Sequence, residues 1–305
     1  MPTLDFLITA WSVRPISALF VLSIGLLYSR GWLRLRSRQE RRIATARLVS
    51  FGLGWLLLVV ALFSPLFVLR TELLLARTTQ QILLGLLAAP LLWLGAPAQT
   101  MRWGLPAGLR RSLTGLLRRE RATGQAVRSA TRPTTVWLLT FGSFLVWADP
   151  AFVQWTVTND GRYSLSLWFF FFVYLLFWMH VVPSGPRLHR AVQPGIGFLY
   201  VLFGGEVPNV VTGITLAFRQ TLVYPVYAAG STTTTLAPLM DQAVSGCLIW
   251  VMGSVIYISL CLSILGRAIR NEDAPPPMPL SWDATERTIA PGLEHRVSAR
   301  KTVGQ

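Results

Sequence analysis

Seven apolar runs, separated by polar segments, form the dominant pattern along this chain. A helix crosses a bilayer core with about 20 consecutive apolar residues, and each run reaches roughly that length. Trp and Tyr stand near many of the run ends, where such side chains anchor membrane helices at the interface. The pattern predicts an all-α polytopic membrane protein, a seven-transmembrane-helix bundle with spans at about 13–30, 44–66, 73–95, 134–155, 163–183, 194–217 and 237–267.

The arginines between the runs predict the orientation of the bundle. The loops after the first, third and fifth runs and the segment after the seventh are rich in arginine, whereas the alternate loops hold only Arg70, Arg162 and Arg219. Positively charged loops stay on the cytoplasmic side of a membrane. We therefore expect the N-terminus outside and the C-terminus inside.

Two polar segments interrupt or follow the bundle. In the loop of residues 98–133, the stretch LRRSLTGLLRRERA has leucines at helical spacing with arginines between them. This pattern predicts a short amphipathic helix on the inner membrane surface. Residues 271–305 contain APPPMP and few apolar side chains, which predicts a flexible cytoplasmic tail after a transmembrane domain of residues 1–270.

The amino-acid composition supports a membrane protein and indicates which kinds of partner its arginines would contact. The 305 residues are 52% hydrophobic and 13% charged, with a mean hydropathy of +0.50, whereas a soluble domain has roughly a quarter charged residues. The net charge of +15 comes almost wholly from arginine. Because these arginines cluster between apolar runs, we interpret them as topology signals and contacts for anionic lipids, and we expect no nucleic-acid partner.

Signatures of soluble enzymes and metal sites are absent from the sequence. There is no P-loop, dinucleotide fingerprint, GxSxG or HExxH motif. The three histidines, His180, His189 and His295, have no metal-site spacing, and Cys247 and Cys261 lie far apart in one apolar run. We therefore expect no catalytic residues, no metal ligands and no cofactor.

Polar residues inside apolar runs remain as candidates, since such residues in a membrane suggest function. The third run begins with Arg77, Thr78, Thr79, Gln80 and Gln81, in which positions 77 and 81 share a helix face, as do 77 and 80. This outer polar cluster could bind a ligand or partner, or it could serve only snorkelling and interhelical hydrogen bonds.

Two further groups lie in the sixth and seventh runs. Glu206, in FGGEVPNV, is an intramembrane carboxyl that could serve a proton or ion path, or could satisfy a kink at Pro208. Asp241 and Gln242 begin the seventh run, where a carboxylate suits a helix N-terminus. Topology predicts that Asp149, Asp241 and Arg77 share the outer side, so that an Arg77–Asp241 or Arg77–Asp149 ion pair is plausible.

Six stretches, in order, carry a family resemblance over about residues 14–270. AAPLLWLGAP (88–97) resembles the characteristic segment of the CtaG family, the seven-span assembly factors of bacterial cytochrome c oxidase. The other stretches similar to that family are LYSRGWLRL (27–35), ALFSPL (61–66), LLFWMHVVP (175–183), LAFRQTLVYPVYA (216–228) and LAPLMDQAVSGCLIWVMGSVIY (236–257). The resemblance implies a bacterial plasma-membrane protein with cytochrome c oxidase subunits as partners.

The departures from the family lie where the resemblance implies copper ligands. The family's third span opens His-Met-x-Gln-His, and these positions here are 77–81, with only Gln80 kept. Asp149 stands where the family often has a histidine. The family also has a histidine and a Glu-His pair at the head of the fifth span, and these align with Tyr163 and with Ser166 and Leu167. Arg77 would repel a cation, and Gln and Thr bind copper poorly beside imidazole. We expect a structural cluster, or a site for an anionic carboxylate or lipid phosphate.

The leading hypothesis is an accessory factor that assists oxidase assembly through protein contacts, without its own copper site. Two alternatives stay open. One is a structural subunit of a membrane respiratory complex, and the other is a proton or small-molecule transporter that uses Glu206.

Overall fold

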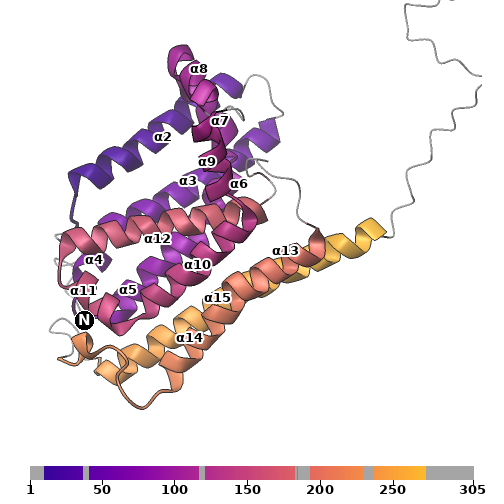
Figure 1. Cartoon of the computed structure of the whole chain (residues 1–305). Helices are drawn as coiled ribbons and strands as arrows, with labels where there is room; N and C mark the ends of the chain where they lie inside the picture. The colour runs from indigo at the N-terminus through magenta and orange to yellow at the C-terminus, as the bar shows by residue number, and fades with distance from the viewer. Residues whose placement is uncertain are drawn as a thin grey trace, which may run out of the picture. The chain divides into compact units, whose positions relative to one another are not determined.

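The computed structural model describes residues 10–36, 41–116, 121–182, 184, 193–229 and 236–272, and this part of the chain is helical without β-strands. Figure 1 shows its long helices running side by side. Six helices are long and apolar enough to cross a membrane: Pro15–Leu35, Thr45–Phe63, Leu74–Leu94, Asp160–Val181, Pro194–Phe218 and Pro238–Arg270. The described residues thus form the helical, multi-pass class of protein that the hydrophobic pattern predicts.

The individual helices divide these spans more finely. In chain order they are α2 (Pro15–Leu35), α3 (Arg41–Phe63), α4 (Leu66–Leu69), α5 (Leu74–Gln81), η1 (Ile82–Ala88), α6 (Ala89–Leu94), α7 (Pro97–Gly104), α8 (Ala107–Leu116), α9 (Ala122–Ala130), α10 (Pro133–Ala148), α11 (Pro150–Val157), α12 (Asp160–Val181), α13 (Pro194–Val201), η2 (Leu202–Glu206), α14 (Val207–Phe218), η3 (Pro225–Tyr227) and α15 (Pro238–Glu272).

The fourth predicted span, residues 134–155, is not one straight helix. Helices α10 and α11 meet at a break with a bend of 75°. Pro150 disfavours helical backbone at the residue before it, and Asp149 is extended there, with φ −70° and ψ 126°. Its carboxylate accepts the Phe152 N–H at 2.8 Å and so caps α11. Counting this bent pair as one span would give seven.

Two spans contain a π-helical turn just before a proline. The segment η1 precedes Pro90, and η2 precedes Pro208. A proline inside a helix has no N–H to donate and its ring clashes with the carbonyl four residues earlier. A shift to wider π-type hydrogen bonding relieves that clash, and such turns recur at functional sites. The segment η1 contributes Ile82 and Leu86 to the pocket described below, and η2 contains Glu206.

The backbones of α2 and α7 approach closely. Gly31 of α2 lies against the Thr100 carbonyl of α7, and Gly104 of α7 lies against the Leu27 carbonyl of α2. Each contact leaves no room for a Cβ atom. Tyr28 strengthens the same region, because its buried hydroxyl donates to the Gly95 carbonyl at 2.9 Å.

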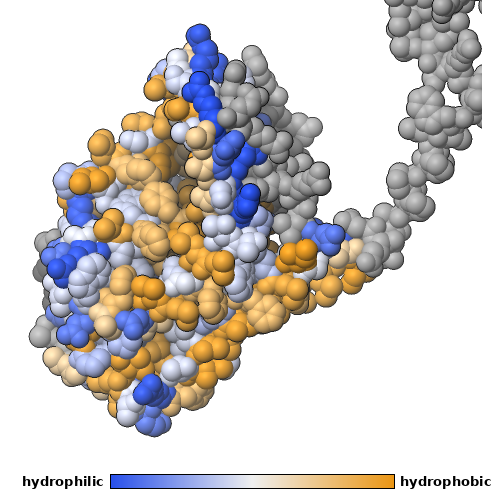
Figure 2. Space-filling view, viewed as in Figure 1, coloured by the Kyte–Doolittle hydropathy of each residue, from blue (hydrophilic) through white to orange (hydrophobic). Residues whose placement is uncertain are grey.

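The loop after the third span contains three short helices rather than one. Helices α7, α8 and α9 all lie within residues 98–133 or at its border, and Leu109 and Leu116 of α8 are exposed. Figure 2 shows hydrophilic side chains over this part of the molecule and apolar ones across the long helices. Location on the inner membrane surface stays a prediction. Most of the predicted tail, residues 273–305, lies outside the described residues, as do His189 and His295.

Candidate functional site

The polar residues at the head of the third span are mostly buried. Helix α5 holds all five, and the exposed fractions of Arg77, Thr78 and Gln80 are 2%, 1% and 0%, while Gln81 is half-buried. Buried polar groups require partners. The hydrogen-bond partners of these side chains therefore indicate whether the cluster is structural or can bind a ligand.

Arg77 points across to the end of α10. Its Nη2 donates to the Trp147 carbonyl at 2.8 Å, and the guanidinium carbon lies 4.8 Å from the centroid of a Trp147 ring. Its Nε is buried and has no hydrogen-bond partner among the residues that the structure describes. Since an arginine guanidinium stays charged, Arg77 places a fixed positive charge inside the bundle.

Gln80 links three helical segments. Its Nε2 donates to the Ala61 carbonyl of α3 at 2.7 Å, and its Oε1 accepts the Tyr163 hydroxyl of α12 at 2.6 Å. Ser166, one turn further on, donates to the Tyr163 carbonyl at 2.8 Å. The sequence resemblance pairs Gln80 with the family's glutamine and Tyr163 with one of its histidines, and in this structure a hydrogen bond joins the two side chains.

Asp241 binds α5 rather than Arg77. Its two carboxylate oxygens accept the backbone N–H groups of Leu74 and Leu75 at 2.7 and 3.0 Å. The N-cap residue of α5, Leu73, offers no capping side chain, so a carboxylate from α15 satisfies the free donors of this helix end.

Gln242, beside Asp241, holds the connection between α14 and α15. Its Oε1 accepts the Val223 N–H at 2.7 Å, and its Nε2 donates to the Thr221 carbonyl at 3.2 Å. These partners are backbone groups, which leaves Gln242 a structural role in this geometry.

The expected ion pairs of Arg77 do not form. Asp241 caps α5 and Asp149 caps α11, and within the described part of the chain Arg70–Asp160 is the ion pair that the structure contains. The sequence suggested that Arg77 could pair with Asp149 or Asp241 because all three were expected on the same side of the membrane. It did not show that free backbone N–H groups at helix ends compete with Arg77 for each carboxylate.

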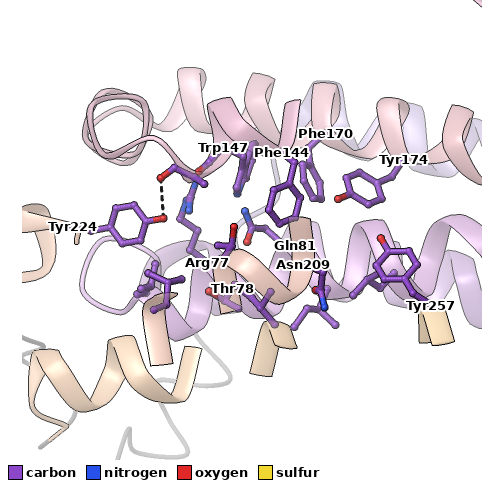
Figure 3. Close-up of a pocket in the computed structure, with 17 residues that line it drawn as sticks. Arg77, Thr78, Gln81, Phe144, Trp147, Phe170, Tyr174, Asn209, Tyr224 and Tyr257 are labelled. Atoms are coloured by element: carbon purple, nitrogen blue, oxygen red, sulfur yellow. Dashed lines mark hydrogen bonds between the residues drawn. The ribbon is translucent and has the colours of Figure 1, made fainter. Parts of the chain in front are cut away.

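A pocket of about 50 Å³ lies beside Arg77 between five spans. Figure 3 shows Arg77, Thr78 and Gln81 at one part of its wall, and Tyr174 and Tyr257 at another. Tyr224 closes the Arg77 side, where its hydroxyl donates to the Ala148 carbonyl at 3.0 Å. The remaining wall is largely apolar and includes Ile82, Leu86, Phe144, Phe170, Leu216 and Ile249. A mainly apolar pocket with a few convergent polar groups is typical of a ligand site.

Tyr227 adds a buried donor close to this charge. Its exposed fraction is 3% and its hydroxyl has no hydrogen-bond partner among the described residues. Burial raises the pKa of Tyr227, while the Arg77 charge acts in the opposite direction. The hydroxyl is therefore protonated near neutral pH.

A second arginine cluster at the start of α12 escaped the sequence reasoning. Arg70 is buried and pairs with the exposed Asp160, and Arg14 donates to the Ser164 hydroxyl at 2.6 Å. Both guanidiniums lie over the Phe67 ring, at 3.5 Å for Arg14 and 4.0 Å for Arg70. Burial, and next the Arg70 charge, lower the pKa of Arg14 to about 10, so it remains charged at neutral pH. The sequence feature that could have indicated this cluster is Arg70, which lies between the second and third apolar runs.

Glu206 lies at the end of the π-helical turn η2 and is 7% exposed. Its Oε1 accepts the Ser254 hydroxyl at 2.7 Å, and its buried Oε2 has no hydrogen-bond partner in the described part of the chain. Pro208 accounts for the local departure from α-helix, as expected. Whether Glu206 carries protons stays a prediction.

Copper does not fit the donor set at the head of α5. The aligned positions supply guanidinium, hydroxyl, amide and phenol groups, and copper prefers imidazole or sulfur ligands. Among the described residues, no three His, Cys, Asp or Glu side chains are grouped so that they could hold a metal ion. The geometry instead suits hydrogen bonding around a fixed positive charge.

The fold and the site define a multi-pass helical membrane protein with a polar cluster at the head of its third span. Residues 26–271 match the model of the cytochrome c oxidase caa3 assembly factor family (Caa3_CtaG), and the chain belongs to that family. This match confirms the resemblance and implies interaction with cytochrome c oxidase components in general. No curated protein and no solved structure matches the chain.

Proposed function

We propose that this protein assists assembly of cytochrome c oxidase through contacts with oxidase subunits, without catalysis and without a copper site of its own. In this proposal α10 and α11 together form the fourth span, so that the bundle in the bacterial plasma membrane has seven spans. The N-terminus is outside, the C-terminus is inside, and arginine-rich inner loops contact anionic lipids. The family match supports a role in oxidase assembly. The buried charge of Arg77, at a position where the family resemblance implies a copper ligand, supports the absence of a copper site.

The burial of the cluster changes which residues would contact a partner. Arg77, Gln80 and Asp241 are too buried for direct protein contact, so they fit a ligand or structural role better. Near the same end of the bundle, Trp155 is 50% exposed and the Asp160 side chain is 80% exposed. Large aromatic and charged side chains often dominate binding energy at interfaces. We therefore assign partner contact to the surface that Trp155, Asp160 and Arg162 form.

A copurification experiment tests the assembly role. Tagged protein should recover oxidase subunits while the oxidase is being assembled, and a Trp155→Ala/Asp160→Ala variant should recover at least about fivefold less, since each lost anchor removes about 1 kcal/mol or more. Leu145→Ala, a change at an exposed position on α10, serves as the control. Recovery with mature oxidase in a fixed ratio would instead support a structural subunit.

Copper binding is expected to require restored imidazoles. The wild-type protein, purified in detergent and incubated with Cu(I) under reducing conditions, should retain no copper after excess metal is removed. Arg77→His/Gln81→His should retain it, because positions 77 and 81 share one helix face and line one pocket. Metal analysis per chain is the measurement, with Arg77→Gln/Gln81→Asn as the matched control. One tightly held copper in the wild type would contradict the proposal.

A further inference from the structure

Two residues that line the pocket each have a side-chain N–H group without an acceptor. The Nε of Arg77 and the Nε1 of Trp147 are buried, and within the described part of the chain neither has a partner. Both residues line the pocket, and Figure 3 shows their side chains on the same side of it. Guanidinium and indole N–H groups can only donate. Whatever satisfies them must therefore be an acceptor.

The charge of Arg77 narrows the acceptor to an anion. Arg77 is 2% exposed, and none of the described carboxylates lies within ion-pair distance of it. The nearby Asp149 and Asp241 carboxylates already cap α11 and α5. A buried charge without a counter-ion is strongly destabilising. An anion in the pocket would both neutralise the guanidinium and accept from the unpaired donors.

The size and walls of the pocket narrow the anion further. One positive charge is neutralised by one negative charge, and about 50 Å³ is a few times the roughly 10–15 Å³ that one water needs. A planar carboxylate fits this space and matches the guanidinium fork. Phe144, Phe170 and Leu86 provide apolar contacts beyond the charged end. We propose that the pocket binds the carboxylate of a small amphiphilic acid, with its head at Arg77 and its apolar stem between the spans.

Binding of alkyl carboxylates to the purified full-length protein tests this inference. The probes are acetate and octanoate, with 1-octanol and octylamine as neutral and cationic controls of equal chain length. Octanoate should raise the melting temperature in a concentration-dependent way, since a ligand that binds only the folded state stabilises it. Acetate should bind more weakly because it lacks the apolar stem, and the two control compounds should have no saturable effect.

Variants locate the binding. Arg77→Gln should weaken octanoate binding about tenfold or more, since charge-assisted hydrogen bonds are the strong ones. Arg162→Gln is the matched control, because Arg162 also lies over a tryptophan, 5.0 Å from the Trp155 ring centroid, but at an exposed position away from the pocket. That variant should bind as the wild type does. Trp147→Phe keeps an aromatic ring and removes the indole donor, so it should weaken binding about threefold or more.

Several results would overturn the inference. They are no octanoate-dependent stabilisation of the wild type, equal binding of octanoate and octanol, equal binding of octanoate and acetate, or unchanged binding in Arg77→Gln. If Arg77→Gln fails to fold, Trp147→Phe decides the outcome, because wild-type affinity in that variant would contradict the donor pair. The inference is independent of the proposed assembly role, since it is measured on the isolated protein.

Discussion

Asp241→Ala is expected to lower the free energy of unfolding by about 3 kcal/mol, because two charge-assisted hydrogen bonds disappear at a buried helix end. The Asp241 carboxylate accepts both the Leu74 and the Leu75 N–H groups. Without it, those donors remain in a region that is largely closed to water, and the first turn of α5 loses its negative cap. The third and seventh spans also lose their polar connection.

The measurement is thermal or denaturant unfolding of the detergent-solubilised protein. Asp149→Ala is the control, because Asp149 also caps a helix but is exposed and accepts a single N–H group, from Phe152. We expect that control to cost about 1 kcal/mol or less. Asp241→Asn should fall between the two, because one amide oxygen can still accept. Equal costs for Asp241→Ala and Asp149→Ala would contradict the assigned cap.

Gly31→Ala is expected to destabilise the docking of α7 on α2 by about 3 kcal/mol or more. The new Cβ would overlap the Thr100 carbonyl and would lie 3.0 Å from the Gly104 nitrogen. Both neighbours are backbone atoms, so no side chain can rotate away to make room. The helices would have to separate, and close packing between them would be lost.

Gly52→Ala provides a matched change in which the same methyl group is added to a helix. Gly52 lies in α3, and a Cβ there meets nothing within 4 Å. Alanine has the higher helix propensity, so this variant should be about 0.5–1 kcal/mol more stable. The melting temperatures of the two variants should therefore move in opposite directions. Faster proteolysis after α7 in Gly31→Ala would locate the change, whereas wild-type stability of Gly31→Ala would show that the two helices can separate at little cost.

The apolar runs predicted the six membrane-length helices of the described residues because a membrane helix leaves a strong local signal in the sequence. A long apolar run is enough to place a helix such as α12, and the break between α10 and α11 is also encoded locally by Asp149 and Pro150. The fourth predicted span, residues 134–155, contains a bend of 75° because proline restricts the backbone of the residue before it, and a seven-span count stays a prediction. The residue types at positions 77–81 were likewise readable from the chain, and the absence of a copper site stays a prediction.

Only the tertiary structure decided which partners the polar side chains take. Asp241 and Asp149 were equally plausible partners for Arg77 in the sequence, but each carboxylate caps a helix. Gln80 meets Ala61 and Tyr163 from distant segments, and the unpaired donors of Arg77 and Trp147 come together only when the third and fourth spans pack. Apolar periodicity is a property of one segment, whereas hydrogen-bond partnership depends on the positions of donors and acceptors from several segments, and packing sets those positions.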